Sequence, residues 1–121
     1  MKTSFENMQV ELDLEGIEVR AERWGDMHVG RFALAPGMDL TPFFAALPGG
    51  LCSGDHWGIV LEGALKVRYR DGTEEVTRAG EAYHWPAGHT AWTDEGAVFL
   101  AVTPLAQQEE MERQMTAAAQ Q

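Results

Sequence analysis

Apolar and polar residues alternate along most of this chain, and that pattern constrains its fold more than any other feature. The segment ALKVRYR at residues 64–70 shows it most clearly, because Leu65, Val67 and Tyr69 alternate with three basic residues. Successive side chains of a β-strand point to opposite faces of a sheet, so the pattern predicts a half-buried strand. The segment IEVRAERW at residues 17–24 alternates in the same way.

Residues typical of turns separate the alternating segments. Gly25-Asp26 and Asp71-Gly72 are two such turns, and Glu62-Gly63 is expected to be a third. Short strands that recur about every 8–12 residues are typical of a β-sandwich or barrel. With 121 residues, the chain is expected to form a single domain over residues 1–121, with the barrel at about residues 8–103. Further strands are predicted at residues 8–14, 27–35, 56–63, 73–78, 81–86 and 97–103.

Two segments fit helices better than strands. DLTPFFAAL predicts a short helix or turn, for which Thr41 could act as the N-cap. The residues after Thr103 are good helix formers and predict a C-terminal helix at about residues 104–118, with Thr103 as its N-cap. Met111 and Met115 lie four residues apart, so they share one side of that helix.

Charge and cysteine content exclude several classes of partner. The chain has 19 acidic and 9 basic residues, for a formal net charge of -10, which would repel nucleic acids and anionic membranes. No apolar run is long enough to cross a bilayer, and the first residues show no secretion signal. Cys52 is the only cysteine, which fits a reducing compartment. We therefore expect a cytoplasmic protein with neither a nucleic-acid nor a membrane partner.

Two segments carry motifs of a known family. The first, GLCSGDHWGIVLEGALKVRY at residues 50–69, contains the tetrapeptide VLEG. The second, GEAYHWPAGHTAW at residues 80–92, has a glycine, five residues, and then Pro86 and Gly88. Over about residues 27–103, the chain resembles the small single-domain members of the cupin superfamily. The resemblance implies an all-β fold, a small antiparallel jelly-roll (cupin) β-barrel that often holds a metal, to which the predicted C-terminal α-helix is added.

The resemblance also implies where metal ligands would lie. The family's usual glutamate position holds His56, and one of its usual histidine positions holds Cys52. A further histidine position falls on Ala91, but His89 lies two residues earlier, and side chains two residues apart on a strand share a face. We predict a metal site formed by Cys52, His56 and His89, with His84 as a candidate fourth ligand. The alternative for each of these residues is ordinary packing inside the protein.

This ligand set indicates the metal and the chemistry. One thiolate and two imidazoles favour zinc most, with copper, iron and nickel as alternatives. Three protein ligands and one open position would let the metal act as a Lewis acid on a small organic molecule, in an isomerase, lyase or hydrolytic step. The alternative is a metal-free barrel that only binds a small molecule, because none of the usual ligand types stands in its usual place.

Aromatic residues define the remaining expectations. If His56 points into the barrel, its neighbour Trp57 should point outward. His28 is expected at the surface or packed against a sheet. The exposed edges of an open barrel predict a homodimer. An apolar cavity for the small molecule is expected to be lined by five aromatic residues, although packing in the core is the alternative for them: Phe32, Tyr69, Tyr83, Trp92 and Phe99.

Overall fold

The computed structural model describes residues 1–119, so the last two residues of the predicted domain lie outside the described part. Within it, the chain forms antiparallel strands, short 3-10 helices (η) and one α-helix. No helix among these residues is both long and apolar enough to cross a membrane. The elements in chain order are η1 (Phe5–Asn7), β1 (Gln9–Leu14), β2 (Ile17–Trp24), β3 (Met27–Leu34), η2 (Thr41–Phe44), η3 (Pro48–Gly50), β4 (His56–Tyr69), β5 (Glu74–Arg78), β6 (Ala82–Trp85), β7 (His89–Trp92), β8 (Ala97–Pro104) and α1 (Leu105–Ala119).

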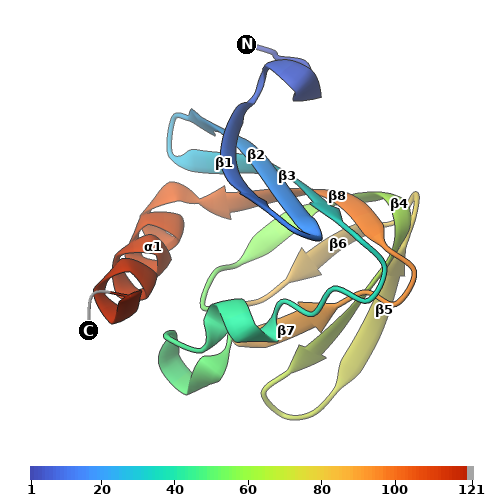
Figure 1. Ribbon diagram of the computed structural model, residues 1–121, viewed down its shortest axis with the longest axis vertical. Coiled ribbons are helices and arrows are strands. Elements are labelled where there is room, and N and C mark those ends of the chain that lie inside the picture. The colour runs from blue at the N-terminus through green and yellow to red at the C-terminus, as the bar shows by residue number, and fades with distance from the viewer. Residues whose placement is uncertain (120–121) are drawn as a thin grey trace.

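The long strand β4 joins two layers of strands. The strand order is β1-β2-β3-β8-β4-β5, and β6 and β7 also pair with β4. The first half of β4 pairs with β6 and β8, whereas its second half pairs with β5 and β7 (Figure 1). Every pairing is antiparallel. The predicted all-β antiparallel fold with a single C-terminal helix is therefore confirmed.

Alternation along the strands produces the core, as the sequence predicts. Side chains of β8 alternate strictly between buried and half-buried, and Ile17, Val19 and Ala21 form the buried face of β2. Leu65 and Val67 of β4 are completely buried, while the basic residues between and beyond them lie on the other face. The short strand β7 has no counterpart among the predicted strands. It begins directly after the turn Pro86-Ala87-Gly88.

The turn expected at Glu62-Gly63 does not form, and β4 continues through it. The register with β8 shifts by one residue between Val60 and Glu62, which makes a bulge rather than a turn. Gly63 has a φ of +70°, and a Cβ at this position would lie 1.9 Å from the carbonyl oxygen of Gly96. Glycine is therefore required where the strand passes from one layer to the other.

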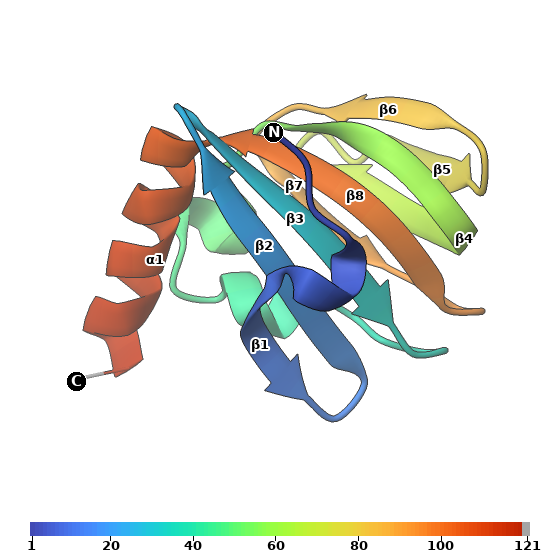
Figure 2. The ribbon, with the colours of Figure 1, turned by 90° about the horizontal axis from the view of Figure 1, so that it is seen from above.

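Helix α1 lies beside the segment that contains η2 and η3 (Figures 1 and 2). Met111 of α1 packs against Leu47 and Cys52 in a small core of its own. The two predicted N-caps are wrong. Thr41 begins η2 without capping it, and its hydroxyl pairs with that of Thr90. Thr103 lies within β8, and its hydroxyl contacts a histidine of the candidate site described next.

Candidate metal centre

The backbone brings Cys52 and His89 together from two separate segments. Cys52 lies between η3 and β4, and its N–H donates to the carbonyl oxygen of His89 at 2.7 Å. In return, the N–H of Gly88 donates to the carbonyl oxygen of Cys52 at 2.8 Å. The N–H of His89 donates to the same oxygen at 3.4 Å, which completes an isolated antiparallel β-bridge between residues 52 and 89. The third predicted ligand, His56, begins β4 four residues after Cys52.

The side chains of these three residues converge inside the protein. Sγ of Cys52 lies 3.2 Å from Nε2 of His56, and the two imidazole rings meet edge to face with their centroids 5.3 Å apart. One ligand atom from each residue lies within 4.8 Å of the others. A tetrahedral zinc with bonds of about 2.0–2.3 Å keeps its ligand atoms roughly 3.5 Å apart, so small side-chain shifts suffice for a common ion. The donor set therefore fits a metal.

Each histidine is held by a hydrogen bond at its Nδ1 atom. Nδ1–H of His89 donates to the carbonyl oxygen of Pro86 at 2.7 Å. Nδ1 of His56 lies 2.5 Å from the hydroxyl oxygen of Thr103. When these nitrogens carry the ring protons, both Nε2 atoms are unprotonated, and that of His56 accepts from the Cys52 thiol at 3.2 Å. Metal-binding histidines usually donate their second N–H to such a partner, which fixes the ring orientation.

Burial keeps the cluster uncharged in the absence of a metal. Removal from water raises the pKa of the Cys52 thiol to about 11 and lowers the pKa of His56 to about 3. Burial also lowers the pKa of His89, although its bond to Pro86 opposes the shift. A metal ion would have to displace the thiol proton, whereas both imidazoles are already in the neutral form that binds metals.

The cluster faces an apolar cavity of about 320 Å³. Cys52, His56 and His89 form one part of its wall, and Trp85 lies beside them. Two of the predicted aromatic residues, Phe32 and Phe99, line it and stack on each other with centroids 5.0 Å apart. Most of the remaining wall is aliphatic or aromatic: Leu12, Ile17, Val19, Leu40, Phe43, Phe44, Leu47, Ala91, Ala101, Met111 and Met115.

A second polar group lines the same cavity, and the sequence did not point to it. His28 is only 2% exposed, and its Nε2–H donates to Oε2 of Glu11 at 2.9 Å. A carboxylate oxygen of Glu112 on α1 completes this group. The guanidinium of Arg23 lies 3.3 Å from both carboxylate oxygens of Glu112 and 4.0 Å from Glu11. Because Arg23 already forms ion pairs with both of these acids, we interpret the group as a hydrogen-bonded network rather than a second metal site.

The other predicted site residues lie elsewhere. His84 is exposed, hydrogen-bonds Asp55 at 3.4 Å and stacks on the outward-facing Trp57, so it does not join the cluster. Neighbours on a strand face opposite ways, which explains why His84 and Trp85 diverge. Tyr83 and Trp92 do not line the cavity: Tyr83 donates to the carbonyl oxygen of Leu100, and Trp92 packs under the guanidinium of Arg68.

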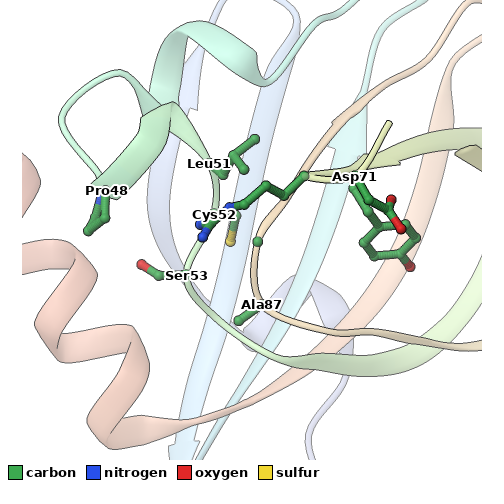
Figure 3. Close-up of a pocket in the computed structure, with 9 residues that line it drawn as sticks. Pro48, Leu51, Cys52, Ser53, Asp71 and Ala87 are labelled. Carbon is green, nitrogen blue, oxygen red and sulfur yellow. The ribbon is translucent and has the colours of Figure 1, made fainter. Parts of the chain in front are cut away.

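Tyr69 borders a different hollow, of about 470 Å³, which is shown in Figure 3. Cys52 lies on the segment before β4 in this view, with Ser53 next to it and Asp71 on the opposite side of the hollow. Cys52 lines this hollow as well as the apolar cavity, yet only 2% of its surface is exposed. The residue therefore separates the two spaces.

Comparison with known proteins identifies the fold. No family model and no curated protein sequence matches this chain. Among solved structures, an RmlC-like cupin from Shewanella frigidimarina NCIMB 400 is similar, with a TM-score of 0.61 and 16% identity, over 84% of this chain and 87% of that one. The chain has the small cupin fold that its two motifs predicted.

Two further structures show the same likeness. A structural-genomics protein of unknown function from Rhizobium leguminosarum bv. viciae 3841 has a TM-score of 0.62 and 26% identity, over 86% of this chain and 95% of that one. The polyketide cyclase RemF from Streptomyces resistomycificus has a TM-score of 0.65 and 19% identity, over 87% and 79% of the two chains. The present chain holds a buried group of one cysteine and two histidines, which could bind a metal.

Proposed function

We propose that this cupin-fold protein binds one divalent transition metal through Cys52, His56 and His89 and holds a small, mostly apolar organic molecule beside it. One observation carries the proposal: three ligand atoms within 4.8 Å of one another face an apolar cavity of about 320 Å³. The hydrogen bonds from the two imidazoles to Pro86 and Thr103 support it, because they leave both Nε2 atoms unprotonated, as metal binding requires.

Three protein ligands leave a coordination position open, as in catalytic zinc sites, so zinc is the metal that this set of three favours. A metal bound there would polarise a carbonyl oxygen of the ligand or activate a water molecule. The cavity's own residues would hold the apolar part of the ligand and exclude bulk water. The proposed ligand is therefore a small apolar carbonyl compound, and the likeness to a polyketide cyclase agrees with that class.

His28 and Glu11 supply the polar group that such a ligand would meet elsewhere in the cavity. Glu11 fixes the ring of His28 by accepting from its Nε2–H, much as a carboxylate orients a histidine base. We propose that this pair orients the ligand and holds or moves its proton. His84 and Glu62 are exposed at the surface and do not line the cavity, so they are not placed to share this role.

A second candidate function is binding of the small molecule without metal. The specific observation in its favour is that Cys52 and His56 are neutral and contact each other at 3.2 Å, so the cluster is satisfied as it stands. An apolar cavity of this size fits a carrier or sensor as well as an enzyme.

Metal content separates the two candidates. Protein purified at neutral pH without chelators is expected to contain close to one zinc or other transition metal per chain, measured by inductively coupled plasma mass spectrometry. The variant His56→Ala is expected to lose this metal. His84→Ala is the matched control and should keep it, because His84 is exposed and lies outside the cluster.

Two results would contradict the metal site. The protein could be metal-free and fail to take up added zinc, or His56→Ala could retain as much metal as His84→Ala. Trp85 lines the cavity, so a small apolar molecule that enters it should quench tryptophan fluorescence. If naphthalene has this effect on a protein that binds no metal, the second candidate is the correct one.

A further inference from the structure

A second sulfur atom lies next to the proposed metal site. Sδ of Met111 is 3.7 Å from Sγ of Cys52. Met111 belongs to α1, is 5% exposed, and lines the same cavity as Cys52, His56 and His89. It stands 59 residues after Cys52 in the chain, so no spacing in the sequence connects the two sulfur atoms.

Gly54 shows that Met111 and His56 approach the same space. A Cβ at residue 54 would lie 2.7 Å from Cε and 3.5 Å from Sδ of Met111, and 3.2 Å from Cε1 of His56. The thioether and the imidazole therefore pack around a position that only glycine leaves open. The φ of Gly54 is not in the left-handed region, so its role here is to leave room rather than to allow a turn.

A thioether therefore lies beside the thiol, and both line the same cavity as the two imidazoles. Zinc sites in proteins are built from cysteine, histidine and carboxylate ligands, whereas a methionine thioether is a recurring ligand in copper sites. Two histidines and one cysteine in a plane, with a methionine as a weak and longer ligand on the axis, are the ligand set of blue-copper sites. For divalent ions in general, copper also binds more tightly than zinc to a given set of nitrogen and sulfur ligands.

We propose that the cluster is a copper site, with Cys52, His56 and His89 as the strong ligands and Met111 as an additional, weaker ligand. The inference rests on the proposed metal site and assigns copper, in place of zinc, as the metal that it binds. The competing explanation is that Met111 only packs against Leu47 and Cys52 in the small core under α1. Met115, four residues later, lines the same cavity and offers a matched control on the same helix.

The experiment adds one equivalent of Cu²⁺ to the full-length, metal-free protein with Cys52 reduced, under anaerobic conditions. A copper–thiolate bond is expected to give an intense visible absorption band and a narrow copper hyperfine splitting in the electron paramagnetic resonance spectrum. Cys52→Ser should abolish both signals. Met111→Leu should still bind copper but shift the absorption, the hyperfine splitting and the reduction potential, because the axial ligand tunes these properties. Met115→Leu should change none of them.

The outcomes distinguish this inference from the proposed function. If one zinc binds through His56 but Cu²⁺ gives no thiolate band, the copper assignment is wrong and the metal site stands. If Met111→Leu and the unmodified protein give identical spectra and potentials, Met111 is not a ligand. If no metal of either kind binds, both proposals fail.

A folding defect in Met111→Leu would not leave the assignment open. Circular dichroism checks each variant, and Met111→Gln provides a second test, since glutamine also serves as an axial ligand in such sites. Met111→Gln is expected to retain the thiolate band with a spectrum distinct from that of the unmodified protein. An unchanged spectrum in a folded Met111→Gln variant would overturn the inference.

Discussion

The hydroxyl group of Thr103 connects β8 to the candidate metal centre through its 2.5 Å contact with Nδ1 of His56. We predict that Thr103→Val lowers zinc affinity by about 10–100-fold, because the imidazole loses the partner that orients it. Isothermal titration with zinc measures this change. Thr93→Val is the matched control: Thr93 is also 1% exposed, and its hydroxyl donates to the carbonyl oxygen of Ala64. Equal zinc affinities in the two variants would contradict an orienting role for Thr103.

Asp71 provides a pH-dependent prediction at the turn after β4. Its Oδ1 accepts hydrogen bonds from the hydroxyl and the backbone N–H of Thr73, and these bonds lower the pKa of Asp71 below 3.8. The folded state therefore binds fewer protons than the unfolded state near that pH, and the stabilisation is complete above pH 3.8 and lost as the pH falls further.

The predicted consequence concerns the free energy of unfolding. The difference between the unmodified protein and Asp71→Ala should be largest at neutral pH and should shrink below about pH 3.8. Urea denaturation at several pH values measures it. A difference that stays constant over this range would contradict the prediction. In a Thr73→Ala background, where Asp71 has lost its hydroxyl donor, the effect of Asp71→Ala on the free energy of unfolding should depend much less on pH.

Single residues also show what the sequence could and could not predict about the site. The sequence was sufficient to predict Cys52, His56 and His89 as site residues, because motif spacing and the two-residue period of strands place them on one side of the sheet. The sequence did not predict the roles of His28 and Met111, because each reaches the cavity only when segments far apart in the chain pack together. His84 was wrongly retained as a candidate ligand because its facing depended on the register of β6, which only the pairing with β4 fixes.

Among the elements, the bulge in β4 gives a test of how the two layers are joined. Gly63→Ala places a Cβ against the carbonyl oxygen of Gly96, and Gly25→Ala, also at positive φ, meets nothing within 4 Å. We predict that Gly25→Ala costs about 1–2 kcal/mol of stability from backbone strain alone. Gly63→Ala adds a steric clash and should cost roughly 3 kcal/mol or more. Chemical denaturation compares the two, and equal losses would mean that the bulge relaxes around the added methyl group.

The same bulge explains which elements the sequence predicted. The alternation of apolar and polar residues located most strands, because a strand with one buried face needs an apolar side chain at every second residue. The pair Glu62-Gly63 was mistaken for a turn because a glycine at positive φ serves a bulge and a turn equally well. What separates the two is the partner strand, and β8 lies more than thirty residues further along the chain.

For the whole molecule, the homodimer remains a prediction, and the edge of the sheet suggests where it would form. Strand β1 ends the strand order, and two of its apolar side chains, Val10 and Leu14, are about half exposed. We expect two copies to pair through β1, giving the mass of a dimer in light scattering at micromolar concentration. Val10→Lys should shift the protein towards the monomer, whereas Val76→Lys on β5 should not. A monomeric unmodified protein would contradict this prediction.

Strand β4 also limits how this protein could be divided. Because its two halves belong to different layers, a chain cut at Glu62 or Gly63 would interrupt β4 where it passes from one layer to the other. Complementing fragments or circular permutants should therefore open at Gly25-Asp26 or Asp71-Gly72, where the backbone only reverses direction between neighbouring strands.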